Sequence, residues 1–146
     1  MRHTTAAGDP AQLEDLPSPA MIVDLDAFES NPAAAADLVR GSGTQLRPHV
    51  KTHRAPGLAI RQLDPNTRGV TCATVGEAEA MVEAGIDDVF LANEIMSADK
   101  ADRLARLAHD ARISIAVDSQ PGVDVIGAAA GRARKTAVED VHRVMG

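Results

Sequence analysis

The sequence has almost no aromatic residues: its 146 residues include two Phe and neither Tyr nor Trp. A core for this chain must therefore be built from small and branched aliphatic side chains, chiefly Ala, Val, Ile and Leu. Such a core gives less hydrophobic stabilisation per buried residue than one rich in Phe and Leu. The length fits one domain, and 45% hydrophobic with 25% charged residues is typical of a globular protein.

Cysteine and basic residues are also scarce. Cys72 is the only cysteine, which excludes an internal disulfide and a cysteine-based metal cluster and fits a reducing compartment. Fifteen Lys and Arg against 21 Asp and Glu give a net charge of −6, which argues against nucleic acid and anionic membranes as partners. No apolar run is long enough to cross a bilayer, and the N-terminus lacks the apolar stretch of a signal peptide. We therefore expect a cytoplasmic protein.

Short apolar runs alternate with amphipathic stretches along most of the chain, after a polar lead-in at 1–17 that we expect to be flexible. The expected strands are 20–24, 45–51, 69–73, 88–92 and 113–117. The expected helices run from 26 or 30 to 40 and over about 55–62, 75–84, 98–111 and 122–133. This alternation predicts an α/β fold of parallel βαβ units with right-handed crossovers.

Two architectures fit this pattern, a partial (β/α)8 barrel and a small doubly wound sheet. The glycine-rich fingerprint of a dinucleotide site does not follow any expected strand, because Gly41-Ser42-Gly43 follows a helix and lacks the third glycine. A P-loop is missing as well. The residues by themselves leave both architectures open.

The segment 46–54 is the most informative about chemistry because it holds five basic or potentially basic side chains. In a strand, Arg47, His49 and Lys51 would share one face. One explanation is an exposed edge strand, which charges and proline protect from aggregation. The other is a ligand site, because Lys51 ends the expected strand, where α/β folds of either kind bind ligands. A lysine beside other cations and shielded from water is suited to act as a nucleophile or Schiff-base former.

Several motifs point to one family. They are Ser18-Pro19-Ala20-Met21-Ile22-Val23-Asp24-Leu25-Asp26, Arg47-Pro48-His49-Val50-Lys51-Thr52-His53, Thr71-Cys72-Ala73-Thr74-Val75-Gly76-Glu77-Ala78-Glu79, Ile86-Asp87-Asp88-Val89-Phe90-Leu91-Ala92-Asn93-Glu94 and Ala116-Val117-Asp118-Ser119. In this order they resemble the start of the D-threonine aldolase and D-serine dehydratase-like group, pyridoxal-phosphate enzymes of fold type III with an alanine-racemase-like barrel. The resemblance covers about residues 16–125, and it does not separate aldolase from dehydratase.

The resemblance implies a site. Lys51 matches the catalytic lysine that forms the internal aldimine with pyridoxal 5'-phosphate, and His49 and Thr52 match residues that line the cofactor pocket. Thr74 and Asn93 follow the next two expected strands, at the rim of the barrel where active sites lie. The expected cofactor-binding residues are therefore Arg47, His49, Lys51, Thr52, Thr74 and Asn93.

The implied substrate is a D-3-hydroxy amino acid, and the cofactor stores electrons while a bond to Cα breaks. Cleavage of Cα–Cβ, as in D-threonine aldolase, gives glycine and an aldehyde. Loss of the Cα proton and the β-hydroxyl, as in a D-serine dehydratase-type deaminase, gives a keto acid and ammonia. In the family a divalent metal assists by polarising the hydroxyl. An amino-acid racemase or a cofactor carrier on the same fold, and an inactive truncated remnant, are the alternatives.

The chain is short for this family, since a complete (β/α)8 barrel takes about 250 residues. We therefore expect a truncated form with about four βα units, comprising the N-terminal half of the barrel at 18–125 and a divergent tail at 126–146. In the family the strand at 20–24 joins a distant β-domain, which also supplies the metal ligands, so we expect no metal site here. A homo-oligomer would cover some of the open sheet edges.

Overall fold

The structure is a computed structural model that describes residues 15–63, 67–133 and 141–143. Its centre is a four-stranded sheet in the order β1-β2-β3-β4, and every neighbouring pair is parallel. The strands are β1 (Val70–Cys72), β2 (Asp88–Leu91), β3 (Arg112–Val117) and β4 (Val141–Arg143). The strand order follows the chain order, as in successive βαβ units. The expected parallel α/β architecture is confirmed.

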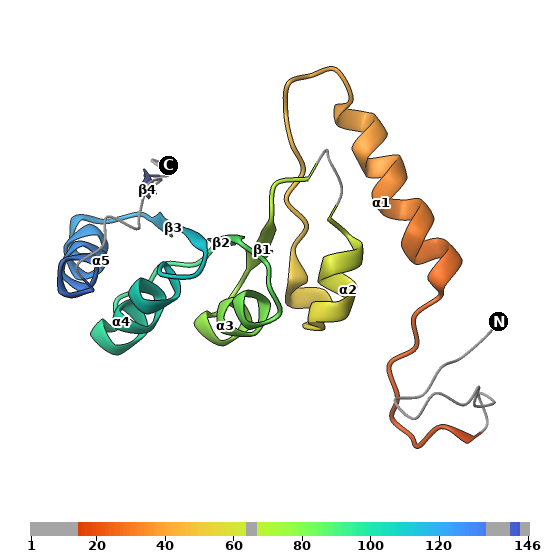
Figure 1. Ribbon diagram of the computed structural model, residues 1–146, viewed down its shortest axis with the longest axis horizontal. Helices are drawn as coiled ribbons and strands as arrows, with labels where there is room; N and C mark the ends of the chain where they lie inside the picture. The colour runs from red at the N-terminus through yellow and green to blue at the C-terminus, as the bar shows by residue number, and fades with distance from the viewer. Residues whose placement is uncertain (1–14, 64–66, 134–140, 144–146) are drawn as a thin grey trace.

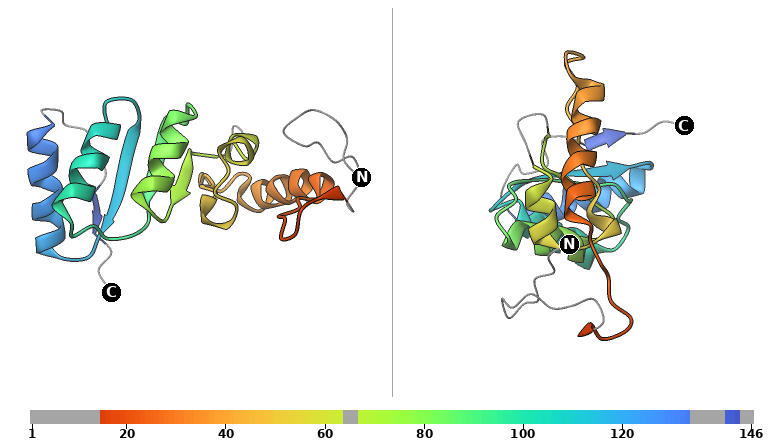
Figure 2. Two further views of the ribbon diagram at one scale, coloured as in Figure 1. Left: turned by 90° about the horizontal axis from the view of Figure 1, so that it is seen from below. Right: turned by 90° about the vertical axis from the view of Figure 1, so that its right-hand side faces the viewer.

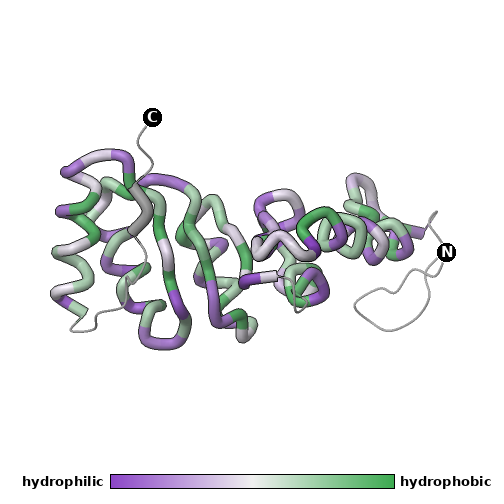
Figure 3. Tube along the Cα trace, turned by 90° about the horizontal axis from the view of Figure 1, so that it is seen from above, coloured by the Kyte–Doolittle hydropathy of each residue, from purple (hydrophilic) through white to green (hydrophobic). Residues whose placement is uncertain are grey.

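Helices α3, α4 and α5 lie side by side along one face of the sheet (Figures 1 and 2). The helical segments are α1 (Leu25–Val39), the 3₁₀ helix η2 (Val50–Thr52), α2 (Pro56–Arg61), α3 (Val75–Glu83), α4 (Ala98–Leu107) and α5 (Gln120–Arg132). Hydrophobic and hydrophilic positions alternate along these helices (Figure 3), as expected for helices that cover one sheet face. Within the described part of the chain, none of the helices has the length and apolarity to cross a membrane.

The core lies between the sheet and these three helices. Val89 and Leu91 of β2 are fully buried and belong to the same core cluster as Met81 of α3, whereas Asp88 and Phe90 are only half-buried. Because strand side chains alternate, Asp88 and Phe90 point to the opposite face. Among the described residues the core is aliphatic apart from Cys72, and neither Phe is part of it. This agrees with the expectation from composition.

The strand expected at 20–24 is wrong: this segment is irregular, and Met21 and Ile22 are exposed. Among the described residues it pairs with no strand, and of its apolar side chains only Val23 is half-buried. Its last residue, Asp24, instead caps α1, because the Ala27 N–H donates to Asp24 Oδ1 at 3.1 Å.

The strand expected at 45–51 is reduced to two isolated parallel bridges, Leu46 with Thr67 and His49 with Thr71. Pro48 lies between them and has no N–H to donate to a ladder. After His49 the chain turns into η2, whose Val50 is fully buried. Lys51 therefore lies on a 3₁₀ turn and not at the end of a strand, so the regular alternation with Arg47 and His49 is broken. The segment does lie at one edge of the described sheet.

At the other end of the chain the strand and helix alternation continues past residue 125. Helix α5 extends to Arg132, and β4 pairs with β3 in the register Ile115 with Val141. The segment 126–146, which we expected to be a divergent tail, thus contains part of α5 and the strand β4, which continue the same architecture. The domain boundaries stay a prediction, and most of the expected lead-in at 1–17 lies outside the described residues.

Candidate functional site

The carboxyl ends of β1, β2 and β3 lie at the same edge of the sheet, because the strands are parallel. Thr74 and Asn93 follow β1 and β2 at this edge, in exposed positions. Both side chains hold the local loops: Thr74 Oγ1 accepts from the Glu77 N–H at 3.2 Å, and Asn93 Nδ2 donates to the Ala73 carbonyl at 2.6 Å. The structure thus brings these two residues to the expected rim.

Lys51 lies at the same carboxyl ends of the strands. His49 is bridged to Thr71, one residue before β1 ends at Cys72, and η2 continues from there. Lys51 and Thr52 are both exposed. A Lys51 side chain shielded from water is therefore not what this structure shows, because among the described residues only Val50 of this turn is buried. The amine is accessible to a ligand that reaches the carboxyl edge of the sheet.

The half-buried His49 ring is tied to the Lys51 turn, since the Lys51 N–H donates to His49 Nδ1 at 3.3 Å. Burial lowers the pKa of His49 below 6.5, the positive charge of Lys51 lowers it further, and the negative charge of Glu77 opposes both. The ring is therefore neutral near pH 7. With Nδ1 as the acceptor, the proton of the neutral ring lies on Nε2.

We expect acid to loosen the Lys51 turn through His49. Because the pKa of folded His49 is lowered from 6.5, the unfolded chain binds this proton more readily. The stability that neutral His49 provides is complete above pH 6.5 and is lost as the pH falls through the lowered folded-state value. Amide hydrogen exchange at Lys51, corrected for intrinsic rates, should rise from about pH 7 to about pH 5. In His49→Gln this rise should disappear; an equal rise in that variant would contradict the assignment.

Glu77 is a functional candidate that reasoning from the sequence missed. A negative charge in the first turn of a helix is ordinarily explained by the helix dipole. In the structure, however, its carboxylate is only 7% exposed, and Oε2 accepts from the Ala73 N–H at 2.8 Å while Oε1 lies 3.2 Å from Arg54 Nε. The available signal was the sequence Thr74-Val75-Gly76-Glu77, which has the spacing of a capping box.

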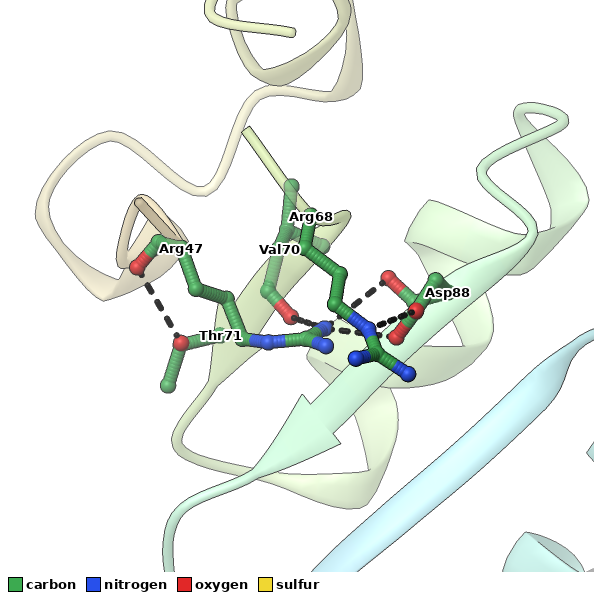
Figure 4. A network of polar contacts seen from close by, with 5 residues as sticks. All are labelled: Arg47, Arg68, Val70, Thr71 and Asp88. Carbon is green, nitrogen blue, oxygen red and sulfur yellow. Dashed lines mark hydrogen bonds and ion pairs between the residues drawn. The ribbon is translucent and has the colours of Figure 1, made fainter. Parts of the chain in front are cut away.

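Arg47 is the one expected site residue that the structure does not bring to the carboxyl ends of the strands. Its Nη1 donates to Asp88 Oδ1 at 2.6 Å and to the Val70 carbonyl at 3.4 Å, and Arg68 Nε lies 3.3 Å from Asp88 Oδ2 (Figure 4). Asp88 is the first residue of β2. The guanidinium is thus held at the amino ends of the strands, opposite to the end where Lys51 lies.

We expect Asp88→Ala to destabilise the chain by about 1 to 3 kcal/mol, because it leaves the Arg47 guanidinium without its carboxylate. The Arg47 and Asp88 side chains are only 20% and 16% exposed, so water compensates the loss incompletely. The exposed neighbour Asp87 supplies the control, and Asp87→Ala should change the urea midpoint little. Equal midpoint shifts in the two variants would contradict this role of the ion pair.

Two further features carry no chemistry. A cavity of about 360 Å³ between α1 and the segment 46–48 is lined, among the expected site residues, by Arg47 alone. Burial raises the pKa of the Cys72 thiol to about 12, with a smaller contribution from the charge of Glu77, so the thiol stays protonated and acts as a core side chain. In the part of the chain that the structure describes, His, Cys, Asp and Glu do not gather in groups able to hold a metal.

Comparison with known proteins gives a consistent result. Residues 23–142 match the family described as alanine racemase, N-terminal domain. The chain is 40% identical over 112 residues to the D-threonine aldolase of an Arthrobacter species, covering 77% of this chain and 29% of that protein. The crystal structure of D-threonine aldolase from Filomicrobium marinum superposes with a TM-score of 0.77 at 41% identity, over 83% of this chain and 33% of that one.

A D-threo-3-hydroxyaspartate dehydratase from Delftia sp. HT23 superposes with a TM-score of 0.71 at 31% identity, over 81% of this chain and 31% of that one. The chain thus spans about a third of the length of the relatives it matches. Its four parallel strands with helices on one face form part of a (β/α)8 barrel, which confirms the expected fold. The chain belongs to the alanine racemase N-terminal domain family.

Proposed function

We propose that this chain is the lysine-bearing part of a pyridoxal-phosphate-dependent lyase that acts on D-3-hydroxy amino acids, and that Lys51 is the residue that binds the cofactor. The observation that carries the proposal is the position of Lys51. Its accessible amine lies at the carboxyl edge of a parallel barrel sheet, next to the end of β1, where barrel enzymes place catalytic groups. The relatives described above are two D-threonine aldolases and a D-threo-3-hydroxyaspartate dehydratase.

The residues at this edge fit pyridoxal phosphate in their chemistry. Lys51 offers a primary amine for the aldehyde, and neutral His49, Thr52 and Asn93 offer polar groups around it. When bound, the cofactor supplies an electron sink for cleavage at the substrate Cα. Arg47 is not part of the proposed pocket, because its guanidinium is held by Asp88 at the other end of the strands.

Two roles follow for the chain's own groups. Lys51 Nζ would hold the cofactor covalently, and once a substrate amine had displaced it, the same nitrogen would be free to take a proton from Cα in the dehydratase or racemase reaction, whereas aldolase cleavage breaks Cα–Cβ instead. His49 orients this turn, because its Nδ1 accepts the Lys51 N–H. Within the described residues, His, Cys, Asp and Glu form no group of three or more that could hold a metal ion.

Cleavage of the D-threonine aldolase type is the first candidate reaction, because the two D-threonine aldolases are 40% and 41% identical to this chain, against 35% for a 3-hydroxy-D-aspartate aldolase and 31% for the dehydratase. The alternatives are dehydration and racemisation on the same fold. Glycine with an aldehyde, a keto acid with ammonia, and the substrate epimerised at Cα are distinct products, so one incubation with D-threonine separates the three. A cytoplasmic location and a homo-oligomer stay predictions.

Reductive trapping tests the proposal. The chain is incubated with pyridoxal phosphate, reduced with borohydride and digested, and the pyridoxyl mass is assigned among its three lysines, Lys51, Lys100 and Lys135. We expect the label to concentrate on Lys51. Lys100 is exposed on α4 and measures the intrinsic reactivity of a surface amine. Labelling of Lys51 no faster than Lys100 would overturn the proposal.

A further inference from the structure

The buried carboxylate of Glu77 is placed between two segments that the proposed site needs. Its Oε2 accepts from the Ala73 N–H in the loop after β1, and its Oε1 faces Arg54 Nε at 3.2 Å, just after the Lys51 turn. Oε1 is inaccessible to solvent and makes no hydrogen bond of good geometry among the described residues. A buried carboxylate is costly unless a charge compensates it. The ion pair with Arg54, whose own side chain is 72% exposed, offsets part of that cost.

Arg54 is itself in an unusual conformation. It has a φ of +52° and is the one non-glycine residue in the described ranges with positive φ. Its N–H donates to the Val50 carbonyl at 2.8 Å, and the His53 N–H donates to the same oxygen at 3.2 Å. These two bonds close the turn that presents Lys51. Strained backbone of this kind persists only where the surroundings hold it, and here the Glu77 carboxylate holds the other end of Arg54.

We infer that Glu77 is a positioning residue for Lys51: through Arg54 it ties the Lys51 turn to the loop after β1, so that the amine and the rim residues keep a common geometry. This inference rests on the proposed function of Lys51 for its catalytic meaning. The structural part of the inference does not depend on that function: the contact between Glu77 and Arg54 makes it rarer for the hydrogen bonds of the turn between Val50 and Arg54 to open.

The electrostatics agree with this placement. The negative charge of Glu77 raises the pKa of His49, against the lowering by burial and Lys51, so the carboxylate lies within electrostatic range of the ring that accepts the Lys51 N–H. The neighbouring carboxylate on the same helix, Glu79, is instead paired with Arg103 of α4. Both are glutamates on α3 that face an arginine, but Glu77 faces Arg54 beside the Lys51 turn and Glu79 faces Arg103 on α4.

Amide hydrogen exchange tests the structural content without any cofactor. Glu77→Gln keeps an oxygen for the Ala73 N–H and removes the charge that faces Arg54. We expect exchange at the His53 and Arg54 amides to accelerate roughly tenfold, the size of one charge-assisted contact. Amides of the core strand β2 should keep their rates. Glu79→Gln is the matched control and should leave the His53 and Arg54 amides unchanged.

A double-mutant cycle identifies the partner. Arg54→Gln should produce the same acceleration as Glu77→Gln, and the double variant should accelerate exchange no further than either alone, since both remove one contact. Additive effects would overturn the inference, because Glu77 would then act on the turn by another route. Unchanged exchange in Glu77→Gln would overturn it directly.

Trapping with pyridoxal phosphate and borohydride adds the functional readout. In Glu77→Gln the ratio of Lys51 to Lys100 labelling rates should fall several-fold at unchanged thermal stability, and in Glu79→Gln it should not. An unchanged ratio would overturn the positioning role. If the wild-type chain itself shows no preference for Lys51, the proposed function fails, while the exchange data still decide whether Glu77 holds the turn.

Discussion

Lys51→Ala should abolish the imine absorbance that the chain acquires when pyridoxal phosphate is added. An imine needs a primary amine, and of the two lysines in the described residues Lys51 is the one at the carboxyl ends of the strands, with its backbone N–H donating to His49 Nδ1. Lys51→Arg should abolish the absorbance equally, because arginine keeps the positive charge but cannot form the imine. The measurement is a titration of each variant with pyridoxal phosphate, followed near the imine band.

Lys100→Ala is the control for this titration. Lys100 is exposed on α4, and its loss should leave the absorbance almost unchanged. If Lys51→Ala and the wild-type chain gave the same titration curve, Lys51 would not be the cofactor lysine and the proposed reaction would lose its central residue.

Among the glycines in the described ranges, Gly69 is the one at which substitution by Ala should cause the largest loss of stability. Gly69 has a φ of +57°, and a Cβ built there would lie 1.9 Å from the Asp88 carbonyl oxygen and 2.6 Å from its carbon. Backbone cannot yield as a flexible side chain can. The left-handed strain and the overlap together should cost about 2 to 6 kcal/mol, a large share of the roughly 5 to 15 kcal/mol that stabilises a typical domain. Urea denaturation followed by circular dichroism measures it.

Gly85→Ala separates the two causes. Gly85 also has positive φ, at +92°, but a Cβ there meets no atom within 4 Å. Only the backbone strain applies, so the loss should be about 1 to 3 kcal/mol. Similar losses at the two positions would show that the close approach to Asp88 is not what makes Gly69 necessary. A much smaller loss at Gly85 would assign most of the Gly69 effect to the contact with Asp88.

The elements with a clear pattern of apolar residues could be predicted from the sequence. The strand expected at 88–92 is β2 at Asp88–Leu91, and the helix expected at 122–133 is α5 at Gln120–Arg132. Their periods of two and 3.6 residues follow from packing against one core. The strand expected at 20–24 shows the limit of this reasoning. An apolar run becomes a strand only if another strand lies beside it, and the residues of the run do not show whether one does.

The candidate site was predictable in part. The clustering of basic residues around Lys51 and the ends of the strands before Thr74 and Asn93 are local features, and the structure places all three residues at one edge of the sheet. The position of the Arg47 guanidinium at the amino ends of the strands was not predictable, because it depends on an ion pair with Asp88, which is 41 residues further along the chain. The role of Glu77 depended likewise on Arg54, which comes from a different element.

The near absence of aromatic residues and the alternation of apolar runs determined, by themselves, an aliphatic core and a parallel α/β architecture, because both follow from local periodicity and from which side chains are available to bury. Only the tertiary structure decided that the Lys51 segment ends in a 3₁₀ turn, that Arg47 pairs with Asp88 at the amino ends of the strands and that Glu77 pairs with Arg54. The physical reason is that charged groups and backbone hydrogen-bonding groups interact with the groups that are close to them in space, and the fold brings those groups together from distant parts of the sequence.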